Sequence, residues 1–184
     1  MSTFFDMDCG GETVTLEKTD DGDIIFHGWD EETEMAAIEL GFEPSPCFAV
    51  WNAINDDRLN TELNEQVVYE GNVLFVKALI FAGADVHWMG DFTLQRAASH
   101  DRADLVKVLL DAGANIEASD SNGWTSLYYA ALHCCTDTVT VLLRAGANIH
   151  APSKKGWTPL SIAEKFGCIN IVEILEDWIR EHGE

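Results

Sequence analysis

An internal period of 33 residues constrains the fold of this chain more than any other feature of its sequence. The segment Asn122-Gly-Trp-Thr-Ser-Leu127 recurs as Lys155-Gly-Trp-Thr-Pro-Leu160, and Ala112-Gly-Ala-Asn-Ile116 recurs as Ala145-Gly-Ala-Asn-Ile149. Two separate motifs with the same shift indicate a repeated structural unit. Because a unit of this length cannot bury its apolar side alone, neighbouring units must stack against each other.

The pattern inside each unit predicts a pair of helices. Apolar residues recur at helical spacing twice within one unit, at Leu127, Ala130 and Ala131 and again at Val139, Leu142 and Leu143. Gly113 and Gly146 follow the second helix, where a residue in the left-handed conformation is favoured. The polar stretch before Gly123 predicts a turn between units.

These residues resemble the ankyrin repeat. Its Gly-x-Thr-Pro-Leu-x-x-Ala opening matches Gly156 to Ala163, and its Leu-Leu-x-x-Gly-Ala-(Asp/Asn)-(Val/Ile) closing matches Leu142 to Ile149. Thr158 and Pro159 would start the first helix of a unit, and Ser126 departs from this proline one unit earlier. The resemblance covers residues from about 62 to 180, and it implies a mainly α solenoid of about four helix-pair units.

Two more units precede the clear ones. One includes Gln95 to Ala98 and Leu105 to Ile116, and a degenerate one includes Val67, Phe75 to Ile80 and Ala82 to Val86. From Gly83 to Gly113 the shift is only 30, so we expect a stunted hairpin finger between Val86 and Gly90. The last helix has apolar residues on one side and charged residues on the other, which suits the end of an array.

Residues 1 to 60 match no repeat and predict a small α+β segment, so we divide the chain into an extension at 1–60 and an array at 61–184. Alternating residues predict a hairpin with strands at Thr13 to Lys18 and Asp23 to His27. A helix capped by Asp30 should end at Gly41, and a second should run from Pro46 to about Asn55. The second helix is apolar enough to dock on the first repeat and cap it.

The net charge of −21 is distributed unevenly. Residues 1 to 70 contain 18 Asp and Glu against two Lys and Arg, which accounts for −16 of the total. This charge argues against direct nucleic-acid binding, since phosphate contacts need Lys and Arg. An acidic face for a basic protein partner explains the asymmetry, and solubility is the alternative explanation.

No targeting segment and no apolar run long enough to span a bilayer is evident, so we expect a cytoplasmic protein without membrane contact. The five cysteines lack Cys-x-x-Cys spacing. Cys168 lies one period beyond Cys135, but neighbouring helices are about 8 to 10 Å apart and a disulfide needs Cα atoms within roughly 7 Å. Small buried thiols are therefore expected rather than bridges.

Candidate partner-binding residues lie at the finger tips and on the first helices, where ankyrin repeats commonly contact ligands: Trp88, Asp91, Ser99, His100, Trp124, Leu132, His133, Trp157, Lys165 and Phe166. Tryptophan is enriched at interfaces, although Trp124 and Trp157 could equally pack against neighbouring fingers. His100 and His133 lie one period apart, and a favourable helix-terminal imidazole is the leading alternative to partner contact.

No catalytic residue, metal ligand or cofactor is expected. Asp6, Asp8 and Glu17 have the spacing of a calcium loop, but the residues that follow alternate like a strand rather than a helix. The sequence therefore favours a binding module without catalysis, such as an inhibitor, immunity protein or antitoxin that grips a basic protein. The alternatives are a scaffold or adaptor that recognises a peptide and, behind it, a calcium-dependent switch or an enzyme.

Overall fold

The structure is a computed structural model that describes residues 2–8, 13–31, 34–35, 38, 46–55, 58–68 and 72–182. The chain divides into two compact units. The first unit consists of residues 1–66 and 72–85, and the second of residues 67–71 and 86–184. The residues of the degenerate first repeat therefore pack mostly with the N-terminal segment.

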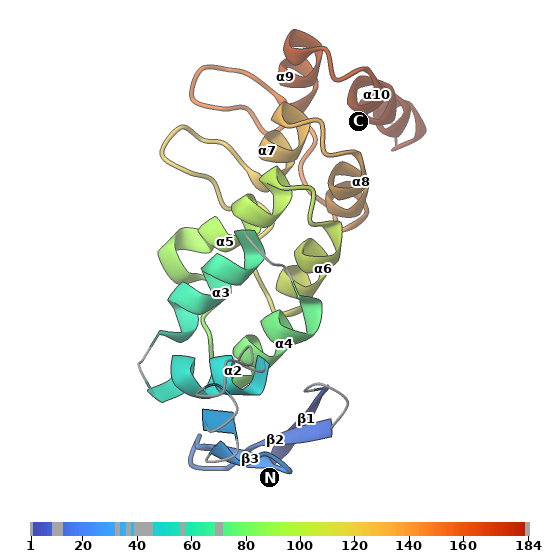
Figure 1. Cartoon of the computed structure of the whole chain (residues 1–184). Helices are drawn as coiled ribbons and strands as arrows, with labels where there is room; N and C mark the ends of the chain where they lie inside the picture. The colour runs from blue at the N-terminus through green and yellow to red at the C-terminus, as the bar shows by residue number, and fades with distance from the viewer. Residues whose placement is uncertain are drawn as a thin grey trace. The chain divides into compact units, whose positions relative to one another are not determined.

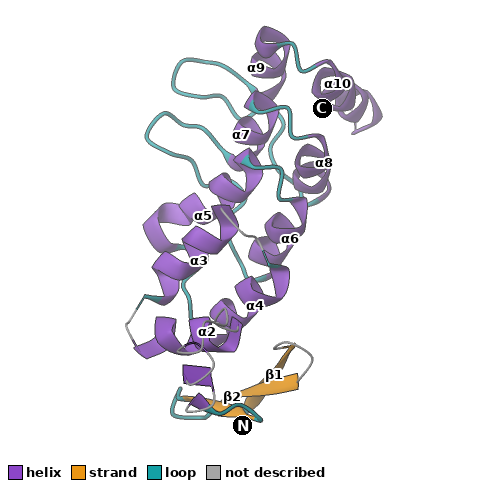
Figure 2. Ribbon diagram, viewed as in Figure 1, coloured by secondary structure: helices purple, strands orange, loops and turns teal. Residues whose placement is uncertain are grey.

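A three-stranded antiparallel sheet opens the first unit, with the strand order β1 (Thr3–Asp8), β2 (Thr13–Lys18) and β3 (Ile24–His27). Figure 2 shows these strands in orange. The predicted hairpin of β2 and β3 is confirmed, whereas β1 was not predicted. Met7, Val14 and Leu16 are fully buried on one face of the sheet.

Helices cover this buried face. Phe5 of β1 stacks on Phe81 of α4 (Val73–Ala82), with ring centroids 5.6 Å apart. The predicted helix α2 (Pro46–Asn55) is confirmed, and it packs against α4 through the side that carries Cys47, Val50 and Ala53. The N-terminal segment therefore covers a helix of the first repeat, as expected for a cap.

Two further helical segments belong to this part of the chain. Helix α3 (Leu59–Val68) lies in the first unit as far as Gln66, and Asp85 at the end of the unit donates its backbone N–H to Asn60 Oδ1 at 2.6 Å. Of the helix expected after Asp30, residues 31, 34, 35 and 38 are helical. Its other residues and the expected stop at Gly41 lie outside the described residues.

The second unit consists of stacked helix pairs. The helices in chain order are α5 (Trp88–Ser99), α6 (Ala103–Asp111), α7 (Ser126–Leu132), α8 (Thr136–Arg144), α9 (Pro159–Phe166) and α10 (Ile169–His182). Helices α5, α7 and α9 form one layer, and α6, α8 and α10 form the other (Figure 1). The fold is therefore the mainly α solenoid with a small α+β segment that the repeat predicts.

Local sequence determines where the helices of this unit begin. Thr158 accepts a hydrogen bond from the backbone N–H of Ser161, whose hydroxyl accepts one from the backbone N–H of Thr158, and Pro159 occupies the first helical position. At the start of α7, the Thr125 hydroxyl accepts a hydrogen bond from the backbone N–H of Tyr128. The leucines of the periodic pattern form the core, and Leu105, Leu127 and Leu142 are at most 1 % exposed.

Two long loops project from the helical layers, at residues 112–125 and 145–158, and are drawn in teal in Figure 2. These are the fingers of the repeats. The connection between α4 and α5 is only residues 83–87, so the prediction of a stunted finger is confirmed. Gly90 and Asp91 adopt positive φ values of 72° and 62° at the start of α5.

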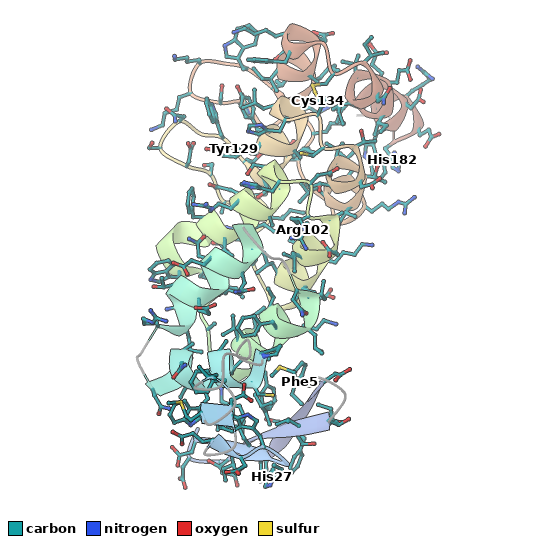
Figure 3. All side chains as sticks on the ribbon, in the orientation of Figure 1. Phe5, His27, Arg102, Tyr129, Cys134 and His182 are labelled. Atoms are coloured by element: carbon teal, nitrogen blue, oxygen red, sulfur yellow. A yellow bond between two sulfur atoms is a disulfide. The ribbon has the colours of Figure 1, made fainter. Side chains whose placement is uncertain are left out.

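The expectation of unbridged thiols is wrong. Cys134, labelled in Figure 3, forms a disulfide with Cys168, and their Cα atoms are 5.3 Å apart. The bridge joins the turn between α7 and α8 to the turn between α9 and α10. The distance between helix axes does not prevent this bridge, because Cys134 lies in a turn, with a positive φ of 58°, and not in a helix. It is one position before Cys135, the residue that is one period from Cys168.

The other described cysteines also differ from one another. Cys47 is disulfide-bonded, whereas Cys135 is a free, buried thiol. Burial raises the pKa of the Cys135 thiol, and the negative charge of Asp101 adds to this effect. Cys135 is therefore the buried free thiol that the sequence predicts, and it is poorly disposed to form a thiolate.

Candidate functional site

The finger of residues 112–125 is held in shape by the carboxylate of Asp120. This carboxylate accepts hydrogen bonds from the backbone N–H groups of Asn122 at 2.8 Å and Trp124 at 2.9 Å, and from the Tyr129 hydroxyl at 3.2 Å. Desolvation by burial is the largest single influence on the pKa of Asp120 and raises it, but the hydrogen bonds together lower it below the ordinary value.

Trp124 is fixed against two tyrosines of its own repeat. Its ring stacks on Tyr128 with centroids 5.1 Å apart and meets Tyr129 edge-on at 5.5 Å. Burial, followed by the charge of Asp120, raises the pKa of Tyr129 to about 12. Since Trp124 remains half-buried, this cluster offers a partner a rigid, partly exposed aromatic surface.

The next finger carries Trp157 in an equivalent position. Its backbone N–H donates to the Ser153 hydroxyl at 3.0 Å, and the Lys165 ammonium lies 4.4 Å from the centre of its ring. Phe166, the last residue of α9, is 57 % exposed. Three predicted residues, Trp157, Lys165 and Phe166, therefore lie together at one end of the unit.

Neighbouring fingers are connected to each other by hydrogen bonds. The backbone N–H of Lys154 donates to the carbonyl of Asn122 at 2.8 Å, and Glu117 accepts a hydrogen bond from the backbone N–H of Asn148 at 2.7 Å. Gly123 lies at the closest approach, where an added Cβ would be 3.0 Å from the Lys154 nitrogen. The finger surface is therefore held in a fixed register.

Trp88 and Asp91 lie at the start of α5, directly after the shortened connection rather than in it. Asp91 is only 7 % exposed, and its carboxylate accepts from the backbone N–H of Asn115 at 2.8 Å and lies 2.9 Å from His87 Nδ1. Asp91 thus has a structural role and offers a partner little surface. Trp88 is half-buried and retains accessible area.

The two predicted histidines lie at the C-terminal ends of α5 and α7. His100 and His133 are both exposed, and His100 Nδ1 is 2.9 Å from the Arg96 carbonyl and 3.0 Å from the Ser99 hydroxyl. These contacts fit the helix-terminal explanation and leave the outer ring edge of His100 accessible. Ser99 and Leu132 are half-buried beside them.

A hollow of about 200 Å³ brings two predicted residues together with four that the sequence reasoning missed. The lining residues are Phe92, Gln95, Arg96, Ser99, His100 and Tyr129. Arg96 and Tyr129 lie one 33-residue period apart, so the repeat itself contained the signal that they stack on adjacent helices.

The calcium-loop pattern lies on strands rather than between helices. Asp6 is in β1 and accepts from the Thr15 hydroxyl at 2.6 Å, and Glu17 is in β2, 2.8 Å from His27 Nε2. The hydrogen bond with His27 is the main cause of a lowered pKa at Glu17. Among the residues that the structure describes, no three His, Cys, Asp or Glu side chains group in a way that could hold a metal ion.

Stacked helix pairs joined by projecting fingers define a repeat protein of the α-solenoid class. A family model of ankyrin repeats, with three copies, matches residues 65–153. This part of the chain therefore consists of ankyrin repeats, which indicate a protein–protein interaction module. A comparison with curated proteins gives no match. Within the described ranges, every helix is too short or too polar to span a bilayer.

Proposed function

We propose that this chain is a binding module without catalysis that grips a basic protein and blocks its action, as an inhibitor, immunity protein or antitoxin does. The observation that carries the proposal is the charge of −16 within the first 70 residues, which include most of the first unit. Such a field speeds the encounter with a cationic partner and disfavours anionic ones. Nucleic acid is excluded as a partner by the same argument.

The outer face of the sheet supports a basic partner. Phe4 and Ile25 lie on either side of Glu17 in the register of the sheet, and they are 62 % and 43 % exposed. Asp6 and Asp8 alternate with buried residues on β1 and so share this face. Exposed apolar anchors surrounded by carboxylates suit a cationic protein surface that also carries apolar groups.

The second unit supplies a less acidic surface. Residues 71–184, which include most of this unit, carry −5, and the finger of Trp157 has lysines at 154 and 155. The clustered aromatic residues Trp124, Trp157 and Phe166 provide rigid contact area there. We therefore assign long-range attraction to the first unit and shape recognition to the fingers and inner helices of the second.

The test is the salt dependence of binding to a partner recovered by cross-linking in the native host. We expect the dissociation constant to rise steeply between 50 mM and 500 mM NaCl, and the substitutions Asp6→Asn and Asp8→Asn to flatten that dependence. Asp111→Asn on α6 is the matched control, because it removes an exposed charge far along the chain. Binding that does not respond to salt would contradict the acidic-face mechanism.

Inhibition is tested separately with the same partner. If the chain is an inhibitor, co-expression should suppress the activity or toxicity of the partner in proportion to complex formation. Unchanged activity in a saturated complex would instead indicate a scaffold.

The alternative is a peptide-recognising adaptor, favoured by the rigid stack of Trp124 on Tyr128. For an adaptor, Trp124→Ala and Trp157→Ala should abolish binding, whereas Phe4→Ala should leave it unchanged. The inhibitor proposal predicts that loss of Phe4 and Ile25 weakens binding as well.

We also propose a cytoplasmic location. The expectation of unbridged thiols supported this location, and the disulfide between Cys134 and Cys168 removes that argument. Alkylation of thiols in intact cells tests it. In a reducing compartment Cys134 and Cys168 should be alkylated before lysis, and protection of both would place the chain in an oxidising compartment.

A further inference from the structure

The hollow beside Arg96 contains a cationic group that forms no ion pair with the residues that the structure describes. The Arg96 guanidinium carbon lies 5.4 Å from the centre of the Phe92 ring, and Tyr129 of α7, labelled in Figure 3, also lines the hollow. The ring of Phe92 supports the guanidinium through a cation–π contact. The planar edge of the guanidinium, which carries the N–H donors, is not used by that contact.

No described carboxylate pairs with this arginine. Arg96 forms none of the ion pairs found among the described residues, and its Nε atom is buried without a hydrogen-bond partner there. Asp and Glu outnumber Lys and Arg by 32 to 11 in this chain, so carboxylates that could pair with an arginine are abundant in the sequence. A cation without a described counter-charge favours an anionic ligand at the part of the guanidinium that the hollow exposes.

The other polar groups of the hollow are already engaged. Tyr129 donates its hydroxyl proton to Asp120, and the Gln95 amide donates to the Ala118 carbonyl at 3.2 Å. The contacts of His100 all involve Nδ1, so its Nε2 atom is not used by the described residues. The guanidinium and His100 Nε2 therefore remain to receive a ligand.

We propose that this hollow binds a carboxylate side chain, Glu or Asp, of the protein partner, with the Arg96 guanidinium as its counter-charge. A guanidinium binds a carboxylate through two parallel N–H···O hydrogen bonds, a geometry that an ammonium cannot reproduce. The volume of about 200 Å³ lies below the roughly 300 Å³ typical of small-molecule pockets, so it suits one side chain. The inference rests on the proposed function only in that the carboxylate belongs to a protein partner.

The first experiment uses the intact chain and a small probe. Side-chain NMR of ¹⁵N-arginine follows the Nε–H resonances during titration with N-acetyl-glutamate amide, and N-acetyl-glutamine amide serves as the uncharged matched probe. We expect the Arg96 resonance, assigned from its loss in Arg96→Lys, to shift in a saturable way with the glutamate probe alone. An equal shift with the glutamine probe, or an equal shift at the exposed Arg144 of α8, would overturn the proposal.

The second experiment separates this site from the proposed function. Binding of the identified partner to Arg96→Lys and Arg96→Met should weaken about tenfold, as for a lost charge-assisted hydrogen bond, whereas Arg144→Lys should bind normally. Because Arg96→Met removes an unpaired cation, its melting temperature should be unchanged or higher, which excludes unfolding as the cause. If the Arg96 variants bind normally while the sheet-face variants bind weakly, the carboxylate site is wrong and the acidic-face proposal survives.

Discussion

The carboxylate of Asp91 accepts a hydrogen bond of 2.8 Å from the backbone N–H of Asn115 in the following finger. One period later Glu117 makes the same kind of contact with the backbone N–H of Asn148 at 2.7 Å. In two successive pairs of repeats, a carboxylate of one repeat thus accepts a hydrogen bond from the equivalent backbone N–H of the next repeat. Asp91 makes this contact from the start of α5, where its φ is 62°.

Replacing Asp91 by alanine should destabilise the second unit by about 1 to 3 kcal/mol, because the backbone N–H of Asn115 loses the charged acceptor that the buried Asp91 provides. Asp111→Asn is the control, since Asp111 is exposed at the end of α6. Urea unfolding followed by circular dichroism measures both. A midpoint for Asp91→Ala equal to that of Asp111→Asn would show that the contact contributes nothing.

Gly123→Ala should be more destabilising than Gly156→Ala, although the two glycines are one period apart and have similar φ values of 77° and 79°. Both variants carry the strain of a left-handed residue, roughly 1 to 2 kcal/mol. Only at Gly123 would the new Cβ meet a neighbouring backbone, at 3.0 Å from the Lys154 nitrogen, whereas nothing lies within 4 Å at Gly156. Thermal unfolding of the pair tests whether the fingers are in contact, and equal losses would argue against it.

The stability difference between the native chain and Asp120→Asn should depend on pH. Because the pKa of Asp120 is lowered in the folded state, its carboxylate contributes stability that is present above the unfolded-state pKa and is lost as pH falls through the folded-state value. We therefore expect the difference in unfolding free energy between the two proteins to be largest at pH 6 and to disappear at acidic pH. Taking the difference removes the effect of the other carboxylates. A gap that stays constant between pH 6 and pH 3 would contradict the prediction.

Removing the Cys134–Cys168 disulfide should destabilise the last two repeats. The bridge spans 34 residues, for which the chain-entropy model gives roughly 3 to 4 kcal/mol. The double variant Cys134→Ser, Cys168→Ser should therefore melt below the oxidised native chain. In strong reductant the two proteins should melt at the same temperature, and a difference that persists there would mean that the serines themselves perturb the turns.

Local rules explain why much of the fold could be predicted. Thr158 with Pro159 marks a helix start, and the alternation from Thr13 to Lys18 marks a strand, because each signal depends on residues close in sequence. The strand β1 was not predicted because it carries Asp6 and Asp8 and is followed by Gly10 and Gly11. The spacing of these residues resembles a metal-binding loop. Its pairing with β2 depends on partners outside the strand itself.

The candidate site was less predictable than the fold. The sequence placed Trp124 and Trp157 on the fingers, but that Trp124 stacks on Tyr128 of its own repeat depends on side-chain packing. It also ranked Asp91 with the surface residues, whereas long-range backbone hydrogen bonding buries it. The period relates Arg96 to Tyr129, but only the side-chain positions show that Arg96 forms no ion pair with the described residues and lines a hollow.

By itself, the sequence determined the repeat, its helix pairs and the unequal distribution of charge, since a fixed period and local capping need no knowledge of distant contacts. The tertiary structure decided the contacts between repeats. It brought Cys134 within bonding distance of Cys168, placed Asp91 under the next finger and left Arg96 beside an open hollow. The physical reason is that stacking juxtaposes residues about one period apart, and the turn geometry then selects which of them meet.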